Sequence, residues 1–163
     1  MIVAMMVFVF ALLIFYNAST AIFNNVAVFE NTKLADETAH LALNSMLLSS
    51  GEPWNWETRN PSTVSLFGLS FSPNVVEPAK AIALAHLLDD NATYIPTRTS
   101  LGLGAYEAYF RVSDSVGSTL SYGGEVVEGG TVPVDPKFKY SYKRLVIFDG
   151  SSAIFELVLS FGG

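Results

Sequence analysis

The chain has 163 residues, of which 50% are hydrophobic and 15% are charged, and its formal net charge is −6. The acidic balance argues against a general nucleic-acid binder. The absence of cysteine excludes disulfides, thiol catalysis and metal sites built on cysteine.

The first 50 residues contain no Gly and no Pro, and their first charged residue is Glu30. Residues 1–29 include 24 apolar residues. This composition predicts a helix that is buried on every side, in lipid or among other helices. We expect one unbroken helix over about 1–50, which ends at Gly51 and Pro53. Since no basic residue precedes the apolar run, we expect a leader to have been removed just before Met1.

From Glu30 onward the same helix is predicted to be amphipathic. Ala27, Leu34, Leu41 and Leu48 recur at seven-residue steps, with Ala35 and Ala42 alongside. This spacing indicates one apolar stripe, on which a domain or a neighbouring molecule packs.

Residues 51–163 are predicted to form a second, β-rich domain. Trp54 and Trp56 are expected to pin a loop against the helix end, and residues 75–90 have helical spacing. Ala105–Ser113 alternates like a strand, and Asp149-Gly150 between two β-rich runs predicts a hairpin.

We therefore predict an α+β fold with two domains. The first is a long N-terminal hydrophobic helix over about 1–50, in which 1–29 lie in a membrane or in a core of several helices and 30–50 are amphipathic. The second is a small surface-exposed β-rich domain over 51–163, with one short helix over about 75–90 and a C-terminal β-hairpin.

The search for catalytic and metal motifs is mostly negative. His40 and His86 are expected at the surface, and Asp89-Asp90 is better explained by a helix end than by a calcium loop. Gly102-Leu103-Gly104 is only a fragment of a dinucleotide-binding pattern. We expect no enzyme activity, no catalytic residues, no metal and no cofactor. Asn91-Ala92-Thr93 is a possible N-glycosylation site at Asn91, in a predicted surface loop.

The C-terminal part of the chain is basic, unlike the rest. Residues 1–136 carry 13 acids and 5 bases, whereas residues 137–163 carry 2 acids and 4 bases. The four bases alternate with aromatic residues, and three interpretations are open: a strand with a lysine face toward solvent, a single-stranded nucleic-acid surface, or a surface that meets acidic parts of a neighbouring copy. The residues concerned are Lys137, Phe138, Lys139, Tyr140, Tyr142, Lys143 and Arg144.

The uncharged N-terminal segment and three shorter segments together resemble archaeal type IV pilins and related pilin-like surface proteins. The shorter segments are Leu47–Glu57, Leu101–Tyr109 and Arg144–Val146. Bacterial relatives carry a glutamate near the start of the helix, where this chain has Met5, and many carry helix-breaking residues. Both departures fit the archaeal branch, in which the helix is continuous.

This resemblance implies a structural subunit of an extracellular archaeal type IV pilus-like filament, which polymerises through its N-terminal hydrophobic helix and serves in adhesion or surface attachment. The implied partners are copies of the same chain, the membrane before assembly, the pilus assembly machinery and a leader peptidase, with no nucleic acid. The alternative is a non-polymerising, membrane-anchored surface protein or minor pilin that binds a ligand. The predicted polymerisation core consists of Met1, Ile2, Val3, Met5, Met6, Phe8, Val9, Phe10, Leu12, Leu13, Ile14, Phe15, Ile22 and Phe23.

Overall fold

The computed structural model describes residues 2–134, 136 and 138–161. The chain divides into two compact units, Met1–Asp36 and Glu37–Gly163. The helix α1 (Ile2–Leu48) runs through this division. It continues for so long because no Gly or Pro interrupts it, and it stops before Gly51, whose φ is +85°.

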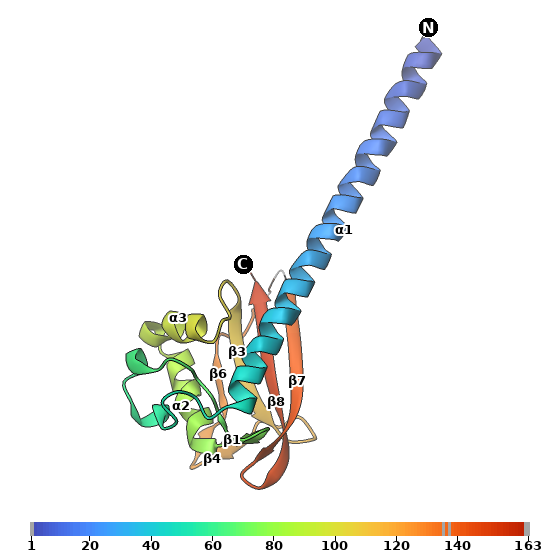
Figure 1. Ribbon diagram of the computed structural model, residues 1–163. Coiled ribbons are helices and arrows are strands. Elements are labelled where there is room, and N and C mark those ends of the chain that lie inside the picture. The colour runs from blue at the N-terminus through green and yellow to red at the C-terminus, as the bar shows by residue number, and fades with distance from the viewer. Residues whose placement is uncertain (1, 135, 137, 162–163) are drawn as a thin grey trace. The chain divides into compact units, whose positions relative to one another are not determined.

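The second unit is built on a six-stranded sheet with the order β1-β2-β7-β8-β3-β6 (Figure 1). Its centre is an antiparallel hairpin in which Asp149 and Gly150 both have positive φ, as a two-residue turn requires. The strands are β1 (Ser70–Ser72), β2 (Val75–Val76), β3 (Glu107–Ser113), β6 (Glu128–Gly130), β7 (Phe138–Phe148) and β8 (Ser151–Phe161), and a separate pair joins β4 (Ser121–Tyr122) to β5 (Glu125–Val126).

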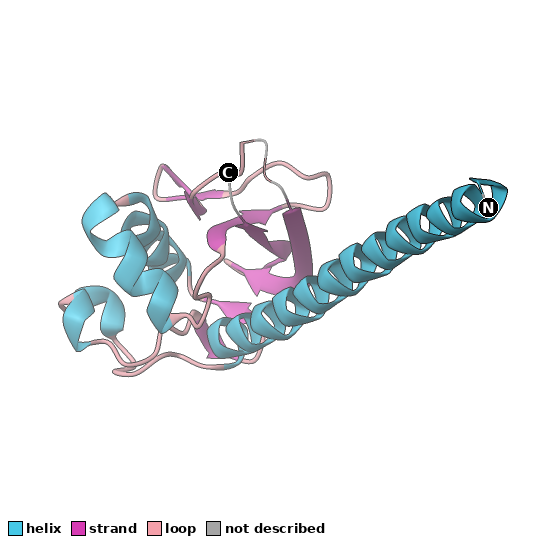
Figure 2. Ribbon diagram, turned by 90° about the horizontal axis from the view of Figure 1, so that it is seen from above, coloured by secondary structure: helices cyan, strands magenta, loops and turns pink. Residues whose placement is uncertain are grey.

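The sheet has two faces of different character, which we call the inner and outer faces. Side chains alternate along each strand, and the inner face carries buried apolar residues such as Phe110, Phe155 and Leu157. Two helical segments pack on this inner face: α2 (Pro78–Asp89) and the last turns of α1. Figure 2 shows these helices beside the strands of the sheet.

The helix α2 lies very close to strand β6. A Cβ atom added at Gly129 would lie 2.5 Å from the Cα atom of Ala85. The backbone of Gly130 also donates a 2.7 Å hydrogen bond to the Asp89 carboxylate. Glycine at 129 is therefore required by the approach of the helix to the strand.

The second-unit part of α1 buries the alanine edge of the predicted stripe and leaves its leucines exposed. Ala39, Ala42 and Met46 are buried, whereas Leu41 is 71% exposed and Leu48 is 52% exposed. Leu43 and Leu47 are buried with these residues, so only the leucines at 41 and 48 point away from the core. The domain of this chain does not cover the predicted leucine stripe.

The segment that follows α1 is held by one tryptophan, not by two. The indole of Trp56 is buried, donates a 2.7 Å hydrogen bond to the carbonyl oxygen of Gly68 and meets the ring of Phe67 edge-on at 5.0 Å. Trp54 is 72% exposed, so the expectation that it pins the loop is wrong. Backbone bonds also link this region to the helix end, since the amide of Leu69 donates to the carbonyl of Met46 at 2.7 Å.

The predicted fold class is wrong. The six-stranded sheet dominates the second unit, and a further helix, α3 (Asn91–Ser100), follows α2 directly. In the part of the chain that the structure describes, no helix combines the length and apolar character needed to cross a membrane. The last turns of α1 belong to the core of the second unit.

The helix α3 escaped prediction because its sequence contains signals that normally end a helix. Asp90 follows α2 as a turn residue, yet its carboxylate accepts a hydrogen bond from the Ala92 amide at 3.0 Å and so caps a new helix. Pro96 lies inside α3, where a proline is unfavourable. Contacts with α2 and β3 outweigh this local preference.

Candidate assembly surface

The described part of the predicted polymerisation core is exposed in the single chain. Its large apolar side chains are between 47% and 74% exposed. Four of them, Leu12 to Phe15, are consecutive, and successive side chains on a helix point about 100° apart. The exposed apolar surface therefore surrounds α1. The residues are Met6, Val9, Phe10, Leu12, Leu13, Ile14, Phe15, Ile22 and Phe23.

The other predicted core residues lie outside the described part of the chain. Met1 is not described at all, and for four more residues only the helical backbone is described: Ile2, Val3, Met5 and Phe8. Their membership of the core remains a prediction.

Polar side chains within this apolar segment bond to their own helix. The Asn17 amide nitrogen donates to the Leu13 carbonyl, and the Thr20 hydroxyl donates to the Tyr16 carbonyl, both at 2.9 Å. A polar group that is hydrogen-bonded costs much less to remove from water than an unpaired one. These two residues are therefore compatible with burial against other helices.

The basic C-terminal strand separates its lysines from its aromatic residues. Lys139 and Lys143 are exposed on the outer face, whereas Tyr140 and Tyr142 lie on the inner face. Arg144 does not join the lysines as we expected. Its guanidinium lies 3.4 Å from the Nδ1 atom of His40, against α1. Lys137 lies outside the described residues.

This separation weakens the interpretation as a single-stranded nucleic-acid surface. Such a surface needs aromatic rings and bases side by side on one exposed face. Tyr142 instead meets the ring of His40 at 5.9 Å. The positions of the lysines agree better with the two other interpretations, in which the lysines face solvent or a neighbouring copy.

A carboxylate on the outer face is held by several donors. Glu156 is 7% exposed and accepts hydrogen bonds from Arg111 at 2.8 Å and Ser141 at 2.5 Å, with the ammonium of Lys143 at 3.7 Å. Burial alone would raise the pKa of Glu156, but the bonds from Ser141 and Arg111 outweigh it and lower the pKa. The charged carboxylate of Glu156 on β8 thus links the strand to Arg111 on β3 and Ser141 on β7.

A second carboxylate joins α3 to the sheet. Glu107 accepts hydrogen bonds from the Tyr94 hydroxyl and, at 2.7 Å, from Arg98. Burial opposes the charged form, but the two bonds prevail and lower the pKa of Glu107. The Tyr94 hydroxyl also accepts from the Ala108 amide at 3.1 Å, so the cluster fixes the start of β3.

The histidines and paired aspartates have structural partners. His86 lies 2.7 Å from the Glu125 carboxylate, and Asp89 and Asp90 accept backbone hydrogen bonds from Gly130 and Ala92. Among the described residues, no group of three or more potential ligands is placed to hold a metal ion.

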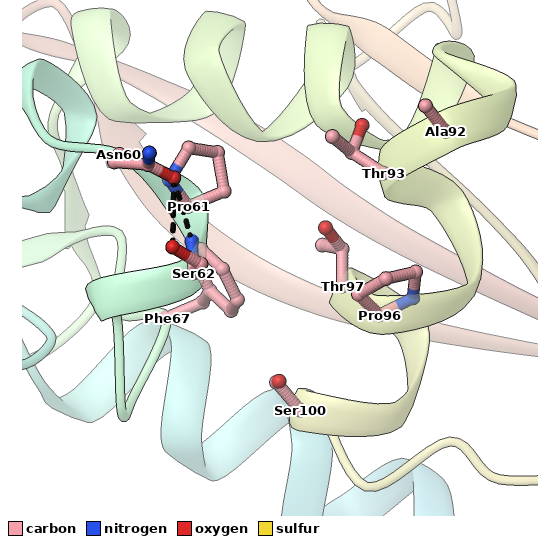
Figure 3. Close-up of a pocket in the computed structure, with 9 residues that line it drawn as sticks. All are labelled: Asn60, Pro61, Ser62, Phe67, Ala92, Thr93, Pro96, Thr97 and Ser100. Carbon is pink, nitrogen blue, oxygen red and sulfur yellow. Dashed lines mark hydrogen bonds between the residues drawn. The ribbon is translucent and has the colours of Figure 1, made fainter.

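A shallow pocket of about 230 Å³ lies between α3 and the short 3-10 helix η2 (Pro61–Thr63) (Figure 3). Its hydroxyl groups are partly occupied, since Ser62 bonds to Asn60 at 2.9 Å and Thr93 to the Leu87 carbonyl at 2.7 Å. Ligand pockets usually enclose about 300–1,000 Å³. The volume of this pocket lies below that range.

Asn91 is exposed, as a glycosylation acceptor must be. It is the first residue of α3, not a loop residue as we expected. Modification at Asn91 remains a prediction.

Sequence reasoning missed one exposed apolar group. Phe71 is 80% exposed, Leu145 is 72% exposed and Ile147 is 38% exposed. The signal was available in β7, because Lys143, Leu145 and Ile147 alternate and so share one face of the strand.

No family model, curated protein or solved structure matches the chain, so the site is interpreted from its own geometry.

Proposed function

We propose that the chain is a structural subunit of an archaeal pilus-like filament at the cell surface, which assembles through α1. The observation that carries this proposal is the exposed apolar surface around the first turns of α1. Met6, Phe10, Phe15 and Phe23 are each at least 67% exposed in the single chain. Extended apolar surface of this kind marks an interaction site, since soluble monomers rarely leave it uncovered.

Packing of identical helices would cover this surface. Full burial of a large apolar side chain contributes about 1.5–3 kcal/mol, so several such residues per subunit outweigh the loss of freedom on association. Asn17 and Thr20 do not oppose this burial because their side chains already bond to the helix backbone. Contacts between different surfaces of successive copies build an open helical polymer when they do not close into a ring.

The proposal is tested by placing a charge in this surface. In Val9→Asp, each copy would bury an unpaired carboxyl group, which costs several kcal/mol per subunit even if the group becomes protonated. We expect filaments to be lost, as seen by electron microscopy, while the circular dichroism of the second unit is unchanged.

The matched control is Val116→Asp, the same substitution at a position that is 87% exposed outside α1. It should leave filaments intact. Normal filaments from Val9→Asp would contradict the proposal, and wild-type protein that never forms fibres would favour the alternative of a non-polymerising surface protein.

A further inference from the structure

The pocket between α3 and η2 combines hydroxyl groups with apolar side chains (Figure 3). Thr93, Thr97 and Ser100 point from α3 toward η2, because residues three and four positions apart share one side of a helix. The apolar surface comes from two prolines and a phenylalanine, which are Pro61, Pro96 and Phe67. The pocket therefore offers hydrogen bonds beside apolar contact.

Thr97 is a buried residue of this pocket whose hydroxyl lacks a partner. The residue is 1% exposed. Within the part of the chain that the structure describes, its hydroxyl forms no hydrogen bond, and its oxygen is not one of the fully enclosed polar atoms. The oxygen of Thr97 is therefore accessible from the pocket that the residue lines. Because buried hydroxyl groups normally have a partner, a ligand in the pocket would supply the one that Thr97 lacks.

The groups around Thr97 include both donors and acceptors. The side-chain oxygen of Asn60 accepts hydrogen bonds from the backbone amide and the hydroxyl of Ser62, at 3.1 and 2.9 Å. This orientation leaves the amide nitrogen of Asn60 as a donor. The Thr93 hydroxyl donates to the Leu87 carbonyl at 2.7 Å, so its oxygen can accept a further hydrogen bond. A ligand with hydroxyl groups matches this set, since a hydroxyl both donates and accepts.

Charge and size narrow the class of ligand. In the described part of the chain, no charged side chain lines the pocket. Phosphates, carboxylates and ammonium groups are held by residues of opposite charge, so the lining favours a neutral ligand. The volume of about 230 Å³ is below that of sites for drug-sized molecules and limits the ligand to a single small ring. A neutral ring with several hydroxyl groups and carbon-bound hydrogens between them is a sugar.

We propose that the pocket between α3 and η2 binds one neutral sugar ring. The hydroxyl groups of the sugar bond to Thr97, Thr93 and Asn60, and its carbon-bound hydrogens contact the prolines and the phenylalanine. The inference does not depend on the proposed filament, because the residues that line the pocket all follow α1 in the chain. A free monosaccharide and the terminal residue of a glycan present the same ring.

The test is saturation-transfer difference NMR of the full chain with glucose, galactose, mannose or N-acetylglucosamine. The detergent that keeps α1 in solution must have no sugar head group. We expect a signal from at least one of these sugars. Thr97→Val removes the hydroxyl but keeps the shape, and it should raise the Kd of that sugar about tenfold, the value for one lost hydrogen bond.

The matched control is Thr99→Val, the same change at an exposed position of α3 that does not line the pocket. The Thr99 hydroxyl donates to the Ile95 carbonyl at 2.8 Å, and its loss should leave the Kd unchanged. Ser100→Ala removes a second hydroxyl of the pocket and should also weaken binding. Thermal unfolding of each variant shows whether the fold is kept.

Absence of a signal from every sugar would show that the pocket holds only water and would overturn the inference. Equal Kd values for folded Thr97→Val and Thr99→Val would also overturn it. If Thr97→Val does not fold, Ser100→Ala decides, and unchanged binding by that variant would reject the sugar site.

An array of glycans that end in the same sugars distinguishes the two sources of the ring. Binding to the array as well as to the free sugar indicates the terminal residue of a glycan, whereas binding to the free sugar alone indicates a monosaccharide. Electron microscopy of Thr97→Val should show filaments like those of the wild-type chain, so loss of sugar binding is separate from loss of assembly.

Discussion

Replacing Glu156 with Gln is expected to destabilise the second unit at neutral pH by about 1–2 kcal/mol. A hydrogen bond to a charged group contributes about 1.5–3 kcal/mol, and Glu156 accepts two such bonds, from Arg111 and Ser141. The side chains of Arg111 and Lys143 are 32% and 58% exposed, so solvent screening reduces the value. Glutamine keeps the shape and one acceptor oxygen, but removes the charge.

The same change should have a much smaller effect in acid. The pKa of Glu156 in the folded protein lies below its ordinary value of 4.5. The carboxylate therefore contributes its full stabilisation above pH 4.5, and this contribution is lost as the pH falls through the lower, folded pKa. In acid the wild-type side chain is protonated and resembles glutamine.

The assay is urea unfolding of the full chain in a mild detergent, followed by the fluorescence of the buried Trp56. Glu30→Gln, which removes the same charge at an exposed position, is the control and should leave the midpoint unchanged at both pH values. An equal loss of stability at neutral and at acid pH would show that charge on Glu156 does not stabilise the sheet.

Two further predictions concern the packing of the second unit. Trp56→Ala should lower the free energy of unfolding by about 3–5 kcal/mol, as measured by thermal unfolding. Trp54→Ala, at an exposed position, should change it by less than about 0.5 kcal/mol. Similar values for both variants would refute the assignment of Trp56 as the residue that holds the loop. Gly129→Ala should cost about 1–3 kcal/mol because the new methyl group would meet the backbone of Ala85, and an unchanged melting temperature would contradict that contact.

Local sequence signals predicted those elements whose cause is local. The strand predicted over Ala105–Ser113 is observed as β3, which begins two residues later at Glu107, and its alternation reflects one buried face. The turn at Asp149 and Gly150 follows from the positive φ angles that these residues tolerate. In both cases the deciding interactions lie within a few residues.

Other features depend on packing between distant segments and could not be predicted. Ala42 and Leu43 are buried whereas Leu41 is exposed, and seven-residue spacing alone does not distinguish these sides of the helix. Arg144 lies on the inner face of the sheet, where its guanidinium is close to His40 of α1, a residue 104 positions away in the sequence. The exposed position of Leu145 likewise requires knowledge of which face the helices cover.

The most direct test of the account is cryo-electron microscopy of fibres assembled from the wild-type chain. The account predicts a helical polymer of this single chain, in which residues 6–29 of α1 from several copies pack around the axis and the sheet of each copy lies outside them. Fibres with the sheets at the axis and α1 on the outside would contradict it, as would a chain that forms no fibres.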